Sequence, residues 1–118
     1  MPAPLEVQLE QVEDGIQIFS LAGELDHATA PELREPLEEA IGSGATAVVV
    51  DLSACRFIDS TGLGVLVHAH RQLAENGGGG SIAVCCPDPD IRRLLEITGV
   101  NRIGLYDTRD EAIAALKS

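Results

Sequence analysis

The chain has 118 residues, of which 19 are acidic and 8 are basic, giving a formal net charge of −11 at pH 7. Nucleic-acid affinity depends largely on lysine and arginine neutralising phosphates, so this charge argues against a direct nucleic-acid partner and against docking on an anionic membrane. With 45% hydrophobic residues, the length suits a single domain, residues 1–118, built around one core.

The start of the chain also bears on location. Met1–Glu6 has neither a basic segment nor an apolar leader, so no secretory signal is expected. No apolar run approaches the roughly 20 residues that a helix needs to span a bilayer. We therefore expect a cytoplasmic protein without a membrane span.

Two strands and a helix are predicted in the first part of the chain. Apolar and polar residues alternate over Leu5–Val12 and again over Ile16–Leu21, which predicts a hairpin around the intervening turn. Thr29 and Glu32 have the spacing of a capping box, so a helix is expected to begin there. Gly42–Gly44 should end it.

The later elements alternate between strand and helix. Further strands are expected over residues 47–52, 81–86 and 103–106, and helices over residues 60–74, 87–97 and 108–116, with Asn76 and Gly77–Gly80 ending the second helix and Gly99 the third. Strands that alternate with helices form parallel pairs. We therefore predict an α/β fold: a small mixed sheet, mostly parallel with an antiparallel edge hairpin, flanked by about four helices in the order ββαβαβαβα.

The segment Phe57–Gly64 contains two hydroxyls and two glycines where a buried apolar run becomes a helix. At a helix start the backbone N–H groups lack partners, so Ser60 or Thr61 could act simply as a helix cap. The same position tolerates a phosphate, because the helix dipole is positive there. Glycine in a first helical turn is costly relative to alanine, so Gly62 and Gly64 indicate the close approach of another backbone or a partner.

Several catalytic and metal-binding patterns are absent from the sequence. The glycine run Gly77–Gly80 precedes a predicted strand and has no following Lys-Ser/Thr, so it does not fit a phosphate-binding loop. His68 and His70 lie two positions apart on a helix and face different ways. Cys55, Cys85 and Cys86 lack the spacing of a zinc site and are interpreted as reduced, core-packed thiols. We expect no metal and no cofactor.

Asp51 provides an alternative phosphate acceptor, because an aspartate after a buried strand is where a phosphoaspartate receiver is modified. Such receivers also need acidic residues at the end of the first strand to hold Mg²⁺, and a lysine after a later strand. Here the first strand ends in a hairpin turn, and the only lysine is Lys117. A hydrogen bond from Asp51 to a neighbouring loop is the better-supported interpretation.

Phe57–Val67 is similar to the signature of STAS domains, in particular those of bacterial anti-sigma factor antagonists. Gly23–Leu33 resembles the other recurrent segment of that family, the turn and helix start after the second strand. The resemblance runs from about Val7 to Leu116, nearly the whole chain. Asp51 also resembles a recurrent family position.

The resemblance implies a partner switch. The serine directly after the motif's aspartate, here Ser60, would be phosphorylated by a partner that is both anti-sigma factor and serine kinase. The unmodified protein would bind that partner and free a sigma factor, and a serine phosphatase would reset the switch. The chain would then be a substrate and not an enzyme. The expected partner-binding residues are Asp26, His27, Asp59, Ser60, Thr61, Gly62, Leu63 and Gly64.

The chain departs from the family pattern in three ways, and a second function is compatible with the resemblance. Thr61 is an alternative acceptor, because some relatives use a hydroxyl at that position. The run Gly77–Gly80 is longer than the family turn needs, and Cys85-Cys86 replaces more ordinary strand-end residues. The alternative function is a STAS subunit assembled constitutively in a lipid-transport ATPase complex.

Overall fold

The computed structural model describes residues 5–13, 15–75, 81–98 and 103–117. Within these ranges the chain forms β1 (Glu6–Glu13), β2 (Ile16–Leu25), α1 (Ala30–Gly42), β3 (Ala47–Ile58), α2 (Ser60–Leu73), β4 (Ser81–Cys85), α3 (Pro89–Ile97), β5 (Gly104–Tyr106) and α4 (Arg109–Lys117). The strands pair in the order β1-β2-β3-β4-β5, with β1 antiparallel to β2 and the other neighbours parallel. The predicted fold class and element order are confirmed.

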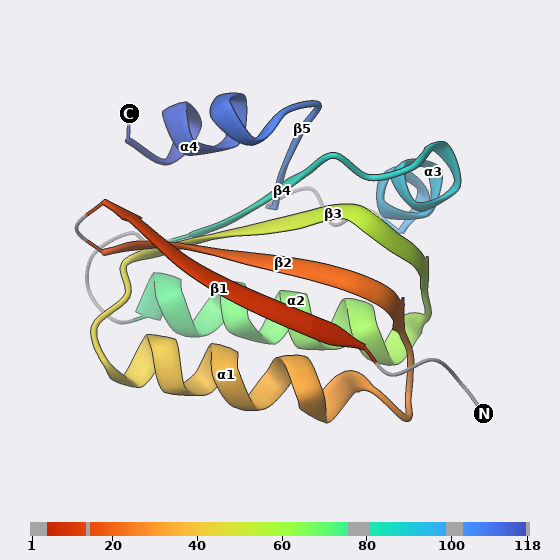
Figure 1. Ribbon diagram of the computed structural model, residues 1–118, viewed down its shortest axis with the longest axis horizontal. Coiled ribbons are helices and arrows are strands. Elements are labelled where there is room, and N and C mark those ends of the chain that lie inside the picture. Colours follow the sequence, from red (N-terminus) through yellow and green to blue (C-terminus); the bar gives the residue numbers. More distant parts are fainter. Residues whose placement is uncertain (1–4, 14, 76–80, 99–102, 118) are drawn as a thin grey trace.

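The helices cover both faces of the sheet (Figure 1). Helices α1 and α2 lie side by side on one face, α4 lies on the other, and α3 lies beside the end of β3 (Figure 1). In the described part of the chain, no helix is both long and apolar enough to cross a membrane. Because α1 follows β2 and α2 follows β3, the carboxyl ends of these two parallel strands lie near the starts of the two helices, at one edge of the molecule.

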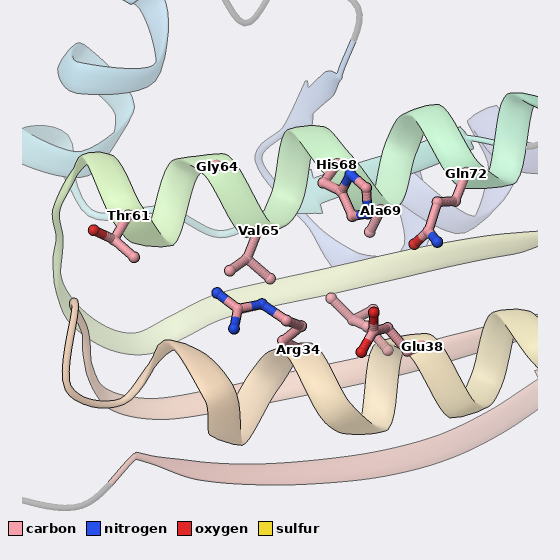
Figure 2. Close-up of a pocket in the computed structure, with 9 residues that line it drawn as sticks. Arg34, Glu38, Thr61, Gly64, Val65, His68, Ala69 and Gln72 are labelled. Atoms are coloured by element: carbon pink, nitrogen blue, oxygen red, sulfur yellow. The ribbon is translucent and has the colours of Figure 1, made fainter.

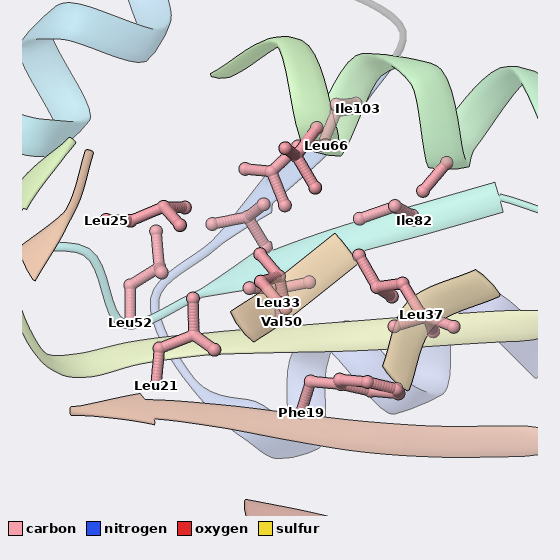
Figure 3. Close-up of a cluster of buried hydrophobic side chains, with 14 of the residues drawn as sticks. Phe19, Leu21, Leu25, Leu33, Leu37, Val50, Leu52, Leu66, Ile82 and Ile103 are labelled. Atoms are coloured by element: carbon pink, nitrogen blue, oxygen red, sulfur yellow. The ribbon is translucent and has the colours of Figure 1, made fainter. Parts of the chain in front are cut away.

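The main core lies between the sheet and helices α1 and α2 (Figure 3). Its fully buried side chains include Phe19, Leu21, Leu33, Leu37, Leu52 and Leu66. Alternate residues of the same strands point to the other face, where Ile18, Val49 and Cys85 pack with Ala112 of α4. Burial on both faces explains why residues 47–52 form a nearly continuous apolar run.

Two strands are longer than the sequence predicts. β2 continues from the expected end at Leu21 to Leu25, and β3 continues from Leu52 to Ile58. The two extensions pair with each other up to Leu25 and Ile58, across register shifts that interrupt the apolar alternation. β3 pairs with β4 only as far as Asp51, so polar side chains in the extension can face solvent.

The predicted capping box at Thr29 and Glu32 is wrong, although α1 does begin at Ala30. The Thr29 hydroxyl donates to the Glu24 carbonyl oxygen over 2.7 Å and accepts from the Asp26 N–H over 2.9 Å. It is therefore directed back into the loop and does not cap the helix. The predicted turn and helix ends at Asp14, Asn76–Gly80 and Gly99 lie outside the described residues.

Candidate functional site

The two segments singled out from the sequence meet at the carboxyl ends of β2 and β3. Leu25 and Ile58 are paired as the last residues of these strands. The Asp59 N–H donates to the Leu25 carbonyl oxygen over 3.2 Å, which extends the pairing by one residue. As a result, the loop of residues 26–29 and the start of α2 form one continuous surface.

Asp59 connects this loop to the start of α2. Its Oδ1 accepts from the Gly62 N–H over 3.0 Å, which makes Asp59 the N-cap of the helix. Its Oδ2 accepts from the His27 N–H, also over 3.0 Å, across 32 residues of sequence. One carboxylate therefore holds the two parts of the candidate site together.

Ser60 is exposed and is the first residue of α2. Because Asp59 caps the helix, the Ser60 hydroxyl is not required for that role. Thr61, the neighbouring hydroxyl, is partly buried and faces the groove between α1 and α2 (Figure 2). The two candidate acceptors therefore lie in different surroundings, with Ser60 the more accessible.

Asp26 organises its own loop. Its Oδ1 accepts from the N–H groups of Ala28 and Thr29, over 2.9 and 3.0 Å. These bonds satisfy donors just ahead of α1 and leave His27 and Ala28 exposed at the tip of the loop. Asp26 is thus a loop-shaping residue that is also partly accessible.

The glycines of the motif differ in their surroundings. Gly62 is buried, and a Cβ added there would lie 2.7 Å from Leu25 Cγ and 2.8 Å from the Leu25 carbonyl oxygen. Leu63 is also buried, with 8% of its surface exposed. Gly64 is exposed and has nothing within 4 Å of an added Cβ. The close approach expected from the glycines is made at Gly62 by the protein's own β2 end.

A groove of about 240 Å³ lies beside the motif, between α1 and α2. Arg34 and Glu38 line it from α1, facing Thr61, Gly64, His68 and Gln72 from α2 (Figure 2). The sequence analysis missed Arg34 and Glu38. Their place on the polar side of a predicted helix gave no indication that α2 would lie opposite.

Phe57 is a further residue whose place on the surface the sequence analysis did not predict. Its side chain is 46% exposed, three residues ahead of Ser60, and it pairs in register with Glu24 of β2. Apolar strand residues next to a buried run are expected to point inward. The register shifts between β2 and β3 explain why Phe57 instead lies on the surface near the site.

Asp51 lies on the face of the sheet covered by α4, with 6% of its surface exposed. Its Oδ2 accepts from Arg109 Nη2 over 2.7 Å and Nε over 3.2 Å, and its Oδ1 accepts from the Ser53 N–H over 2.9 Å. Burial alone would raise the pKa of Asp51, but the bonds from Arg109 and Ser53 outweigh it, so the pKa lies below its usual value. The sequence analysis missed Arg109.

The cysteines follow the sequence-based interpretation only in part, because Cys86 is not fully buried. All three cysteines are free thiols, with Cys55 and Cys85 buried and Cys86 partly exposed. Burial raises the pKa of Cys55 and of Cys85, which keeps both protonated at neutral pH. His70 is partly buried, and its Nδ1 accepts from the Ile82 N–H over 3.0 Å, which ties α2 to the start of β4.

The sequence of this chain matches one known protein family. Residues 8–112 match the family model of the STAS domain. The chain belongs to the STAS domain family. The match includes β1 from Gln8 onward, all of β2 to β5 and the junction at Ser60, so the resemblance stated from the sequence is confirmed.

Similar STAS proteins carry a consistent name. The chain is 35% identical over 115 residues to the anti-sigma F factor antagonist of Paenibacillus polymyxa, covering 96% of both proteins. It resembles the crystal structure of an anti-sigma factor antagonist from Mycobacterium paratuberculosis with a TM-score of 0.86 and 31% identity, covering 100% of both chains.

The Bacillus protein SpoIIAA is a third similar STAS protein, with solved structures in two states. The unphosphorylated form matches with a TM-score of 0.81 and 28% identity over 95% of this chain and 96% of that one. The phosphorylated form matches with a TM-score of 0.73 and 29% identity over 93% and 98%. The same STAS fold is therefore found with and without a phosphoryl group.

Proposed function

We propose that this STAS protein is an anti-sigma factor antagonist controlled by phosphorylation of Ser60. The unphosphorylated protein binds an anti-sigma factor that is also a serine kinase, and a sigma factor is released. The observation that carries the proposal is the exposed Ser60 at the start of α2, whose cap is supplied by Asp59. The names of the similar proteins support the same function.

Phosphorylation changes binding more than folding in this mechanism. The kinase transfers the γ-phosphoryl group of its ATP to the Ser60 oxygen, ADP leaves, and the hydroxyl proton passes to a base of the kinase. The product adds about −1.5 to −2 charge at pH 7. Within the domain this charge lies at the positive end of α2, which tolerates it. Across the interface it is desolvated and repelled by acidic or phosphate groups of the partner.

The docking surface consists of exposed and partly exposed residues around Ser60. These are Asp26, His27, Asp59, Ser60, Thr61 and Gly64. Gly62 and Leu63 are buried and shape the surface from inside, so they contribute without direct contact. The chain acts as substrate, the ATP belongs to the kinase, and the phosphorylated protein is reset by a serine phosphatase in the cytoplasm.

The two alternative functions have less support. A receiver needs an accessible carboxylate beside other acids that bind Mg²⁺. Asp51 is instead buried and paired with Arg109, and the group of potential metal ligands that it joins in the described chain consists of Asp51 and two cysteines. A lipid-transport subunit is not favoured, because the similar proteins are named as antagonists.

The test is phosphorylation by a purified anti-sigma factor kinase from the same organism. After incubation with ATP, intact-mass and peptide mapping should find one acid-stable phosphate on Ser60, and the modified protein should no longer bind the kinase in a gel-filtration or calorimetric assay. Ser60→Ala should bind without being modified. Ser43→Ala, an exposed serine at the other end of α1, is the matched control and should behave like the wild type.

Each other result has a definite meaning. Full modification of Ser60→Ala would move the acceptor to Thr61. An acid-labile adduct on Asp51 would support a receiver. Stable binding to an ATPase complex that ATP and kinase never release would support constitutive assembly.

A further inference from the structure

A group of potential metal ligands lies away from Ser60, where β3 and β4 run side by side. Asp51 of β3 pairs in register with Cys85, the last residue of β4, and Cys86 follows directly. The two sulfurs and a carboxylate oxygen of Asp51 all lie within 4.8 Å of one another. The proposed function makes no use of this group.

The backbone at Cys86 brings the two sulfurs together. Consecutive residues of a regular strand point to opposite faces, which would separate neighbouring cysteines. Cys86 has a φ of 60°, the left-handed region that side-chain-bearing residues seldom adopt, and its N–H donates to the Tyr106 carbonyl oxygen over 3.1 Å. The chain therefore turns at the end of β4, and both thiols lie beside Asp51.

We propose that Cys85, Cys86 and Asp51 bind a zinc ion, with water as the fourth ligand. Zn–S bonds of about 2.3 Å and Zn–O bonds of about 2.0–2.2 Å place tetrahedral donors roughly 3.4–3.8 Å apart, so the group needs to contract by about 1 Å. Cys86 is partly exposed at a strand end and can make this movement. The same exposure gives the ion and its water a path to the buried Cys85 and Asp51.

The charges of the site balance. On binding, the two thiols release two protons to solvent and form two Zn–S bonds, and Asp51 supplies one oxygen ligand. Two thiolates and one carboxylate carry three negative charges, which zinc and the Arg109 guanidinium balance together. Arg109 already holds Asp51 Oδ2 at 2.7 Å and the Ser53 N–H holds Oδ1, so the carboxylate has the outer-shell support typical of metal ligands. Balancing the charges in this way lowers the cost of placing zinc beside the buried Asp51 and Cys85.

The zinc site is separate from the phosphorylation site. Asp51 pairs with Ser20 and Ile58 with Leu25, so the two β3 residues are separated by five steps of the neighbouring strand β2, which is about 17 Å. The metal group also lies on the sheet face covered by α4, whereas the groove beside Thr61 lies between α1 and α2 on the other face. Zinc is therefore expected to stabilise the β3–β4–α4 side without altering the docking surface.

The test uses the full chain, stripped with a chelator and kept reduced with a phosphine. Titration with Zn²⁺ by calorimetry should give one site per chain, and Co²⁺ should produce a thiolate-to-metal charge-transfer band. Loss of an outer-shell partner alone typically lowers metal affinity about 10–100-fold, so Cys86→Ser should weaken zinc binding at least tenfold and reduce the band to the intensity expected of the single Cys85 thiolate. Cys55→Ser, a free buried cysteine outside the group, is the control and should keep both.

A second measurement uses the wild-type chain, so its result does not depend on the correct folding of a variant. Zinc should slow alkylation of Cys86 by iodoacetamide, and excess chelator should restore the rate. Zinc binding of equal affinity in Cys86→Ser, a cobalt complex without the charge-transfer band, or alkylation indifferent to zinc would each overturn the proposal. Any of these results would assign zinc to surface histidines or carboxylates.

Discussion

The Asp59 carboxylate accepts a hydrogen bond from the backbone N–H of His27, 3.0 Å away, although the two residues are 32 positions apart. The other oxygen of the same carboxylate caps α2 through the Gly62 N–H. The loop after β2 and the helix that presents Ser60 are therefore fixed by one side chain. Removal of Asp59 should disturb both parts together.

Asp59→Ala is expected to lower the free energy of unfolding by about 1–2 kcal/mol, because it removes a helix cap. The loss should be somewhat larger than that of a cap alone, because the His27 N–H also loses its hydrogen-bond acceptor. Partner affinity should fall with it. Asp88→Ala is the matched control, because Asp88 caps α3 through the Ile91 N–H over 2.8 Å. Urea unfolding should show a slightly smaller stability loss in Asp88→Ala than in Asp59→Ala, and calorimetry should show weaker partner binding only in Asp59→Ala. Equal affinities in the two variants would contradict the role of the connection in binding.

Gly62→Ala and Gly64→Ala should have opposite effects, although the two residues lie in the same helical turn. A Cβ at position 62 would lie 2.8 Å from the Leu25 carbonyl oxygen, so the helix must shift, and we expect a loss of about 1–3 kcal/mol. Position 64 has open space, so alanine should add up to about 1 kcal/mol through its helix propensity. Thermal and urea unfolding measure both. A Gly62→Ala protein as stable as the wild type would show that the end of β2 can move to accommodate the added Cβ at little cost in free energy.

The contacts made by Asp59 and Gly62 could not be predicted from the sequence, although the order of the elements could. Alternating strand and helix patterns were sufficient for the element order, and the hydroxyls after Asp59 were the basis for the candidate site. The bond from Asp59 to His27 and the contact of Gly62 with Leu25 depend on β2 and β3 ending side by side. The register shifts that extend both strands leave no regular period in the sequence, so the ends of β2 and β3 were placed too early.

Ser60→Asp should abolish partner binding with little effect on stability. An acidic residue in the first helical turn is worth about 0.3–1 kcal/mol, so the free energy of unfolding should change by no more than that and the Tm by a few degrees. Ser43→Asp places the same charge at the far end of α1, where it should cost a similar small amount and leave binding intact. Differential scanning calorimetry and partner titration provide the comparison. A collapse of the fold in Ser60→Asp would show that Ser60 is chiefly structural.

Arg109 illustrates another kind of contact that the sequence does not reveal. Asp51 lies in a buried strand, so it required a partner, but Arg109 follows 58 residues later at the start of α4. Ser20 of β2 also accepts from Arg109, over 3.0 Å. Only the docking of α4 against β3 and β4 brings these groups together, and no local sequence pattern indicates that docking.

Arg109→Met is expected to destabilise the chelator-treated protein by about 2–3 kcal/mol. It keeps much of the side chain's apolar bulk but leaves the Asp51 carboxylate, 6% exposed, without its charged donor. Arg92→Met removes an ion pair with Asp107, whose side chain is 80% exposed, and should cost under about 1 kcal/mol because water screens that pair. Urea unfolding at neutral pH measures the difference. Adding Asp51→Leu to Arg109→Met should recover part of the loss, because it removes the unpaired buried charge, and failure to recover would indicate that packing of the Arg109 stem dominates.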